Sequence, residues 1–238
     1  MELGQHISQR YTQELEDIRS MVLKMGGLVE SQAENAVKAL LERDLELAEL
    51  VASSDHAIDT MEIKLDEECA RVIARRQPKA SDLRLVIAVV KVITDLERIG
   101  DEAEKIGTFS IKLSKKQTVT GLHSELSHLS QLVLSMLHDS LDAFARLDSE
   151  QAMRIVGMND ELNKEVNMLS RLLITHMMED TRNIKSVLRV TWCARSLERI
   201  GDHSRNISEY VVYMVKGKDI RHAKMDKVMA ELFPDEES

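Results

Sequence analysis

The chain carries one six-residue stretch twice, first as Leu96-Glu97-Arg98-Ile99-Gly100-Asp101 and again, unchanged, as Leu197-Glu198-Arg199-Ile200-Gly201-Asp202. The copies stand 101 positions apart, a little under half of the 238 residues. When residues 82–106 are aligned with residues 183–207, nine of the 25 positions are identical. Self-similarity over such a distance is typical of two copies of one structural unit. The sequence therefore predicts two structurally equivalent halves.

Each copy of the stretch contains two acids four residues apart, Glu97 with Asp101 and Glu198 with Asp202. On a helix this spacing places both carboxylates on one face, one turn apart. Steps of seven residues back from the first pair reach mostly apolar side chains, so we expect an apolar stripe that ends in two acids. The simpler interpretation is a solvated face, where like charges repel by only about 0.2–0.5 kcal/mol. The exact repetition favours coordination of a hard cation.

A second set of oxygen ligands falls on the preceding helix of each half. Asp55 and Asp59 are again four residues apart, and the matching positions in the second half are Asn159 and Asn163. Facing the first acid pairs, these side chains would complete an all-oxygen ligand set, which suits Mg²⁺, Mn²⁺, Fe or Ca²⁺ better than structural Zn²⁺. Asp and Asn also begin helix turns, and this structural role is the alternative for the second set.

The composition predicts an all-α protein. Apolar residues make up 43% of the chain and charged residues 31%, whereas aromatic residues account for only 3%, with 2 prolines and 9 glycines. Long runs of β-branched and aromatic residues bounded by turn signals are largely missing, and Leu, Ala, Glu, Lys, Arg and Met dominate. This is the composition of long helices.

Charge and cysteine content narrow the range of partners and cellular locations that the sequence allows. The net charge of −9 argues against nucleic acid as the main partner, because phosphate binding needs a concentrated positive face. Cys69 and Cys193 lie far apart and form no CxxC motif, so we expect reduced, core-like residues. With no export signal at the N-terminus and no apolar stretch long enough to cross a bilayer, the sequence predicts a cytoplasmic protein without a membrane span.

The apolar periodicity predicts three long antiparallel helices in each half. Asp44 and Asp148 are expected to cap the second helix of each half, Ser81-Asp82 the third helix, and Gly217 to close the last one. Gly26-Gly27 inside the first helix indicates either a close helix approach or a kink. The polar run 115–121 is the best linker, so the predicted domains are residues 1–116 and 117–238, with a frayed acidic tail after His222. The first expected helix ends at Arg43, the second runs from Asp44 to before Pro78, and the third covers residues 81–114. The fourth begins at Leu126, the fifth begins at Asp148, and the sixth covers residues 182–214.

No catalytic constellation stands out. The chain has no Gly-rich phosphate loop, no GxSxG and no HExxH. Ferritin-like di-iron proteins place Glu-x-x-His on two helices, and neither copy has it, although a metal-dependent helical-bundle enzyme stays the alternative. His203 follows the second motif where Glu102 follows the first, so it is not part of the repeat. A basic patch around Pro78 is either a solvated hinge or a surface for an acidic partner; it comprises Arg71, Arg75, Arg76, Lys79 and Arg84.

These features together resemble the PhoU family of accessory regulators of phosphate transport. The resemblance rests on the two Leu-Glu-Arg-Ile-Gly-Asp motifs, on Met25-Gly26-Gly27, and on the hinge from Arg75 to Arg84, and it covers nearly the whole chain. It implies two three-helix bundles related by a pseudo-twofold axis, and metal clusters at E(D)xxxD pairs. Carried over residue by residue, the metal motifs fall on Glu97, Asp101, Glu198 and Asp202, and less directly on Asp55 and Asp59. Asn159 and Asn163 depart from the acidic pattern of the family, which puts a symmetric cluster in doubt.

The resemblance also implies a function. Members of this family are negative regulators of the phosphate-starvation response. They restrain the phosphate-sensing histidine kinase when phosphate is plentiful, work with the phosphate ABC transporter and its ATPase, and form dimers or higher oligomers. We therefore expect a non-enzymatic signalling adaptor, a homodimer that also modulates phosphate uptake, with Mg, Mn, Fe or Zn ions as its only cofactors.

Overall fold

The described residues of the computed structural model, 2–54, 56–115, 122–223 and 225–232, form helices and connecting turns with no strand. In chain order the helices are α1 (Glu2–Glu42), α2 (Leu45–Val51), α3 (His56–Arg76), α4 (Ser81–Ser114), α5 (His123–Arg146), α6 (Ser149–Gly157), α7 (Asn159–Glu179), the short 3₁₀ turn η1 (Thr181–Asn183), α8 (Ile184–Lys216) and α9 (Met225–Leu232). The all-α prediction is confirmed.

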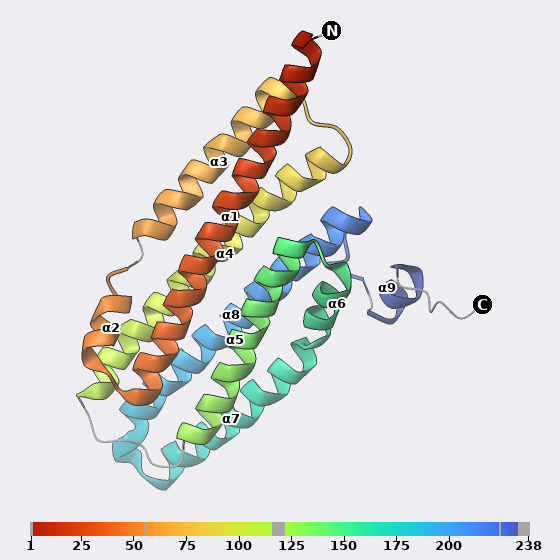
Figure 1. Cartoon of the computed structure of the whole chain (residues 1–238). Helices are drawn as coiled ribbons and strands as arrows, with labels where there is room; N and C mark the ends of the chain where they lie inside the picture. Colours follow the sequence, from red (N-terminus) through yellow and green to blue (C-terminus); the bar gives the residue numbers. More distant parts are fainter. Residues whose placement is uncertain (1, 55, 116–121, 224, 233–238) are drawn as a thin grey trace.

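The long helices form two three-helix bundles that lie side by side (Figure 1). One bundle contains α1, α4 and the α2–α3 pair, and the other contains α5, α8 and the α6–α7 pair. The bundles meet chiefly where α4 packs along α8, and also where α1 packs against α5. The equivalent halves expected from the repeat are present in the helix order. The predicted domain boundary at residues 116 and 117 lies outside the described residues.

The second helix of each half is broken, and the prediction of one continuous helix was wrong. In the first half α2 ends at Val51, where the Ser53 hydroxyl donates to the carbonyls of Glu49 and Leu50, and the Ser54 hydroxyl donates to the Val51 carbonyl. Serine side chains that satisfy helix carbonyls compete with continuation of the helix. The apolar periodicity runs across the break because both pieces bury the same side of the bundle.

The predicted caps are confirmed in three of four cases. The Asp44 carboxylate accepts from the Leu47 amide at 3.0 Å, and Asp148 accepts from the amides of Glu150 and Gln151. Gly217 ends α8 with φ of 73°, in the left-handed region that glycine adopts without steric cost. The cap expected at Ser81-Asp82 is wrong: Ala80 precedes α4 with no side-chain bond, and Asp82 instead accepts from the Tyr11 hydroxyl at 3.0 Å.

One apolar core runs through both bundles and contains Met25, Phe144 and the two cysteines. Cys69 and Cys193 are buried and free, as expected, and burial raises the pKa of each thiol to about 12. A Cβ added to Gly26 would stand 2.8 Å from Leu141 on α5, whereas one on Gly27 would meet nothing within 4 Å. Gly26 therefore permits the close approach of α1 and α5, the first of the two alternatives for this glycine pair.

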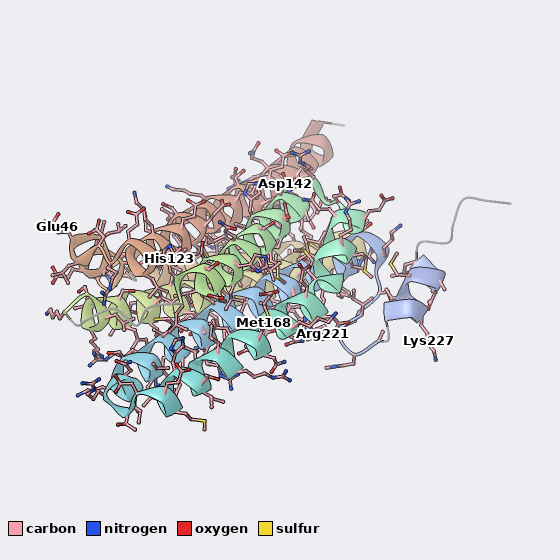
Figure 2. All side chains as sticks on the ribbon, turned by 90° about the horizontal axis from the view of Figure 1, so that it is seen from below. Glu46, His123, Asp142, Met168, Arg221 and Lys227 are labelled. Atoms are coloured by element: carbon pink, nitrogen blue, oxygen red, sulfur yellow. The ribbon has the colours of Figure 1, made fainter. Side chains whose placement is uncertain are left out.

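The segment after α8 is not a frayed tail over its whole length. Residues 225–232 form α9, and Val228 and Ile220 are buried. The segment that carries Arg221 and Lys227 lies at one end of the molecule, beyond the long helices (Figure 2). Two apolar anchors therefore order a stretch whose polar composition predicted fraying. Residues 233–238, the acidic end of that tail, lie outside the described residues.

Candidate functional site

The two Leu-Glu-Arg-Ile-Gly-Asp motifs lie on α4 and α8, the two helices that join the bundles. Their Leu and Ile side chains are fully buried, and their glycines are points of close approach. A Cβ on Gly100 would stand 3.0 Å from Ile58, and one on Gly201 would stand 2.6 Å from Leu162. In both halves an aliphatic side chain, from α3 in the first half and from α7 in the second, thus fills the space that the glycine leaves. The motif sets how α3 and α7 pack on the central helices.

The acid pairs lie at the edge of the apolar core and not in line with its buried side chains. The side chains of Glu97 and Asp101 are 18% and 25% exposed. The core face of α4 consists of other residues, among them Val86, Val89 and Ile93. The stripe expected from seven-residue steps was wrong, because the residues it reaches are half-buried or, at Thr94, exposed. Several helices pack around α4, so its buried arc is wide and the acids fall on its flank.

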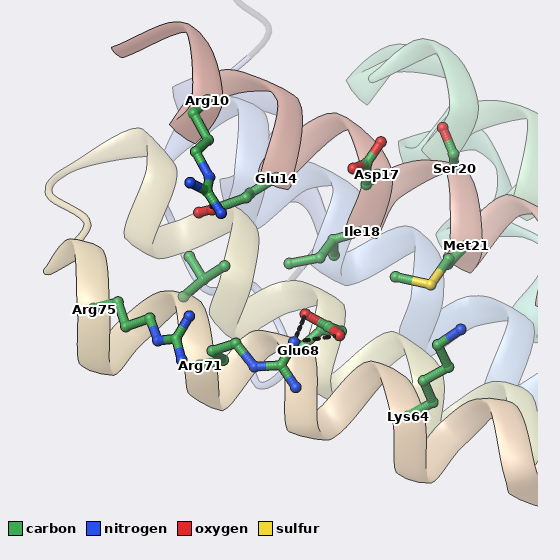
Figure 3. A pocket seen from close by; sticks show the side chains of 11 residues that line it. Arg10, Glu14, Asp17, Ile18, Ser20, Met21, Lys64, Glu68, Arg71 and Arg75 are labelled. Carbon is green, nitrogen blue, oxygen red and sulfur yellow. Dashed lines mark hydrogen bonds and ion pairs between the residues drawn. The ribbon is translucent and has the colours of Figure 1, made fainter. Parts of the chain in front are cut away.

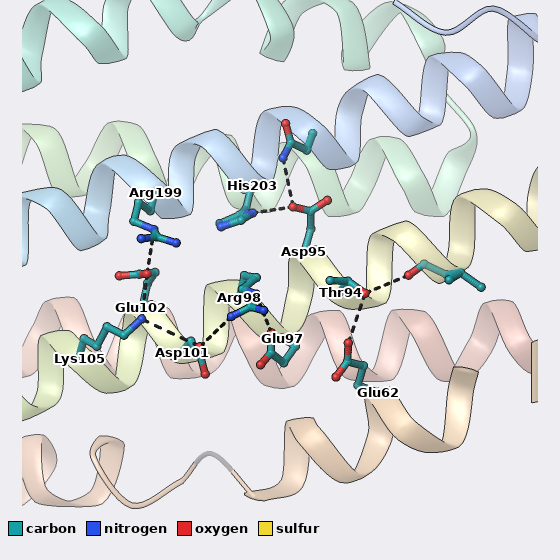
Figure 4. Close-up of polar contacts among 12 residues, drawn as sticks. Glu62, Thr94, Asp95, Glu97, Arg98, Asp101, Glu102, Lys105, Arg199 and His203 are labelled. Atoms are coloured by element: carbon teal, nitrogen blue, oxygen red, sulfur yellow. Dashed lines mark hydrogen bonds and ion pairs between the residues drawn. The ribbon is translucent and has the colours of Figure 1, made fainter. Parts of the chain in front are cut away.

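In the first motif the counter-charge comes from the motif's own arginine. Arg98 Nε lies 3.4 Å from a Glu97 carboxylate oxygen, and Arg98 Nη1 lies 3.6 Å from Asp101, with Lys105 Nζ 4.0 Å from Asp101 (Figure 4). The pKa of Glu97 is nevertheless raised, first by burial and then by the charge of Asp101. The remaining electrostatic cost is the kind that a bound cation would relieve.

The neighbouring helix α3 adds acids on the same side. Glu62 accepts from the Thr94 hydroxyl at 3.3 Å, and the charges of Glu62 and Asp59 both raise the pKa of Glu97. The structure therefore brings the predicted Asp59 toward the first motif. Glu62, seven residues after Asp55 in the sequence, joins it and was not among the predicted ligands. Asp55 itself lies outside the described residues.

The second motif has different neighbours. Glu198 pairs with Arg195 at 2.8 Å, and the pKa of Asp202 is raised by burial, against the opposing charge of Arg205. Arg205 also donates to the Asn159 side-chain oxygen at 3.0 Å. Asn163 is exposed. An arginine and an amide here take the place that two acids have in the first half.

Sequence reasoning missed a polar cluster between the two motif helices. The buried Asp95 of α4 lies 2.5 Å from His203 Nδ1 and accepts from the Asn206 amide at 3.1 Å, while Glu102 of α4 lies 2.9 Å from Arg199 (Figure 4). The α4 side supplies acids and the α8 side supplies bases. The available signal in the sequence was a difference between the copies, because His203 occupies the position that Glu102 has in the first half.

The basic patch around Pro78 is partly neutralised within the first bundle. Arg76 forms a bidentate pair with Glu14, at 2.7 and 2.8 Å, and Arg71 pairs with Glu68. A cleft of about 550 Å³ between α1 and α3 is lined by Glu14, Glu68 and Arg71, so its walls carry both signs of charge (Figure 3). Its basic side chains include Arg10 and Arg75. Mixed walls favour neither an anion nor a cation.

The metal expectation can be tested against the donor groups. The oxygen ligands are of the right chemical type, but within the described residues no three His, Cys, Asp or Glu side chains stand close enough together to hold an ion. Arg98 and Lys105 occupy the neighbourhood of the first pair instead. Metal coordination would require these cations to move aside.

No helix among the described residues is long and apolar enough to cross a membrane.

Comparison with known proteins gives one consistent answer. The PhoU domain model matches residues 22–109 and 126–211, one match in each half. The phosphate-specific transport system accessory protein PhoU homolog of Pseudomonas putida is 49% identical over 230 residues, which cover 97% of this chain and 90% of the relative. The accessory protein PhoU of Escherichia coli K12 is 46% identical over 233 residues, covering 97% and 96% of the two chains.

Solved structures agree with the sequence relatives. The crystal structure of PhoU from Pseudomonas aeruginosa superposes with a TM-score of 0.85 at 47% identity, covering 87% of this chain and all of that one. The phosphate transport system regulatory protein PhoU from Streptococcus pneumoniae gives 0.81 at 32% identity, covering 88% and 98%. With both halves matched, the repeated motif explained and the fold shared, the chain belongs to the PhoU family.

Proposed function

We propose that this protein is an accessory regulator of a phosphate-specific transport system. The observation that carries the proposal is similarity over nearly the whole chain to proteins named as accessory to that system, at up to 49% identity. Both domain matches fall on the helices that build the two bundles. Such a protein acts by binding other proteins and not by turning over a substrate.

In this proposal the chain is an adaptor in the cytoplasm, working as a homodimer. Its long helical faces bind the ATPase of the phosphate ABC transporter and the phosphate-sensing histidine kinase. When phosphate is plentiful the adaptor holds the kinase in its restrained state, which makes the protein a negative regulator of the starvation response and a modulator of uptake. The contact along α4 and α8 joins the two bundles and would hold their faces next to each other.

A reporter and a binding measurement test the proposal together. Deleting the gene should switch on a phosphate-starvation reporter in phosphate-rich medium, and the intact chain should restore repression. The purified protein should also bind the purified transporter ATPase and the cytoplasmic part of the kinase. An unchanged reporter, or binding to neither protein at micromolar concentration, would contradict the adaptor function.

We also propose that the acid pairs bind divalent or ferric ions, with Glu97, Asp101 and Asp59 in one half and Glu198 and Asp202 in the other. The raised pKa of Glu97 and of Asp202 supports this, because burial disfavours the ionised form of both acids and a bound cation would favour it. A hundredfold excess of metal over Kd should stabilise the fold by about 2.7 kcal/mol. Binding would displace Arg98 from Glu97 and Asp101.

Replacing Glu97→Gln and Asp101→Asn together provides the metal test. The double variant should lose stabilisation by Mn²⁺, Mg²⁺, Zn²⁺ or Fe at the first site, while its melting temperature in chelator equals or slightly exceeds that of the wild type. The reason is that burial and the like charge of Asp101 raise the pKa of Glu97 although Arg98 lies beside both acids, so neutral side chains are favoured when no metal is bound. If none of these metals shifts the wild-type melting temperature, the acids are an ordinary partly buried surface.

A further inference from the structure

The repeat places an equivalent cluster of one cation and two aromatic rings at each end of the contact between α4 and α8. The first, which we call the covered cluster, consists of Lys91, Tyr210 and Tyr213. The second, the open cluster, consists of Trp192, Phe109 and Lys112. Each member of the open cluster stands 101 positions from its counterpart, so Trp192 replaces Lys91 and Lys112 replaces Tyr213.

In the covered cluster the Lys91 ammonium lies over both rings, 5.4 Å from the centroid of Tyr210 and 5.8 Å from that of Tyr213. The chain that follows α8 passes beside it. Asp219 pairs with Arg221, and the charge of Lys91 acts on it as well. Together these two cations lower the pKa of Asp219 to about 2. The next residue, Ile220, is buried. The protein therefore supplies this cluster with a carboxylate from its own C-terminal segment.

In the open cluster the rings of Trp192 and Phe109 are stacked, with centroids 6.4 Å apart and planes 11° from parallel, and Lys112 lies 5.3 Å over Phe109. Trp192, the only tryptophan of the chain, is 57% exposed. Toward the start of α8 the exposed residues Leu188 and Ile184 continue the apolar surface. Large exposed aromatic side chains bordered by polar groups are typical of protein interaction sites.

The open cluster also has positive charge without a matching acid. Arg189 donates to the Lys112 backbone carbonyl at 2.9 Å, and within the part of the chain that the structure describes neither Arg189 nor Lys112 pairs with a carboxylate. A groove of about 620 Å³ between α4 and α8 begins at the two stacked rings. The cations farther along it, Lys105 and Arg195, already have acid partners.

We propose that the open cluster docks an acidic segment of a protein partner, which places one large apolar side chain against Trp192 and a carboxylate beside Lys112 and Arg189. The proposal rests on the regulatory function proposed above, because it names the surface through which a partner binds. The carboxylate of the occupant is inferred from the counterpart at the other end, where Asp219 supplies it, and the apolar side chain from the exposed Trp192, Leu188 and Ile184. Charge complementarity with Lys112 and Arg189 indicates that the segment is negatively charged. The stacked aromatic rings provide the surface to which its apolar side chain binds.

The lone tryptophan makes docking directly observable. Protein labelled with fluorotryptophan has a single ¹⁹F resonance, from Trp192, and we expect this resonance to shift when the purified transporter ATPase or the cytoplasmic part of the kinase is added. Trp192→Ala and Lys112→Glu should each weaken binding of that partner about tenfold or more. Lys115→Glu, which changes the same charge one turn further along the chain, should weaken it less than about twofold.

The outcomes separate this inference from the function on which it rests. If a partner binds but the ¹⁹F resonance does not move and both variants bind normally, the docking surface is elsewhere and the adaptor function stands. If neither protein binds at all, the proposed function fails first. If anionic lipid vesicles move the resonance and the partner proteins do not, the cluster faces a membrane and the inference is wrong. Rescue of Lys112→Glu by an acid-to-lysine change in the partner would identify the docked carboxylate.

Discussion

The two Leu-Glu-Arg-Ile-Gly-Asp motifs are identical in sequence and differ in surroundings. The acids of the first lie beside the further acids Asp59 and Glu62 and are held by Arg98. The acids of the second lie beside Arg195 and Arg205, the latter bonded to Asn159. The shared residues explain a shared packing, with a glycine on the central helix receiving an aliphatic side chain. They do not determine the chemistry at the acids, which depends on side chains from other helices.

The same divergence makes the two halves complementary. Where α4 meets α8, α4 contributes Asp95 and Glu102, and α8 contributes His203 and Arg199. Two copies of the first half, paired in the same manner, would set Asp95 against Glu102 in place of His203, while Glu102 would keep an arginine partner in Arg98. The charges therefore favour the first half pairing with the second, which duplication alone would not do.

The largest expected effect comes from breaking this pairing at its buried point. Asp95→Ala leaves His203 and Asn206 without their shared acceptor at a position where Asp95 is only 7% exposed. We expect a loss of about 3 kcal/mol in the free energy of unfolding, measured by urea denaturation. Glu102→Ala is the matched control. Its partners Arg199 and Lys105 are 57% and 49% exposed, so water solvates them and the loss should be about 1 kcal/mol. Glu102 is itself buried, so equal losses would show that the exposure of the partners does not distinguish the two pairs.

A reciprocal exchange tests how closely the second helix approaches in each half. Gly107 corresponds to Ser208, and a Cβ at residue 107 would lie 3.1 Å from the Ala48 carbonyl oxygen and the Ala52 nitrogen, both backbone atoms that cannot rotate away. Gly107→Ser should therefore cost about 2 kcal/mol despite better helix propensity. Ser208→Gly loses the bond from its hydroxyl to the Ser204 carbonyl and should cost about 1 kcal/mol. Thermal denaturation of both variants measures the difference.

Gly27→Ala is the control for these two substitutions. A Cβ there meets nothing within 4 Å, so the gain in helix propensity should raise stability by up to about 1 kcal/mol. A stabilising Gly107→Ser would mean that α2 moves away freely and that the two halves pack alike.

The smallest expected effect concerns the contact of α1 with α5. His138 Nδ1 lies 2.6 Å from the Glu30 carboxylate, and this hydrogen bond, followed by the charge of Glu30, raises the pKa of His138 above 6.5. The pair therefore stabilises the fold fully below pH 6.5, and the contribution is lost as pH rises through the raised pKa. Because the His138 side chain is 69% exposed, about 0.5 kcal/mol or less is expected.

Comparison of His138→Gln with the wild type across pH 5–9 checks this effect. The two stabilities should converge at the alkaline end. A difference that grows with pH would reverse the sign and exclude the ion pair as its source.

Local rules determined much of this fold from the sequence. The helical composition, the caps at Asp44 and Asp148, the glycine end of α8 and the two equivalent halves all follow from the residues themselves. Each of these depends on neighbours in the chain or on exact repetition. The breaks at residues 52–54 and at Met158 were not predictable from periodicity, because the apolar pattern continues across them.

Only the tertiary structure decided what the acids meet. Glu97 and Glu198 have the same sequence context, but the helix packed beside each one brings carboxylates to the first and an amide with its arginine to the second. The cluster of Asp95 with His203 joins residues 108 positions apart, and neither residue repeats in the other half. Likewise only the tertiary structure shows that Trp192 is 57% exposed, although it holds the same place in the repeat as Lys91. Such facts arise from which segments meet in space, and a single helix's sequence carries no information about its neighbours.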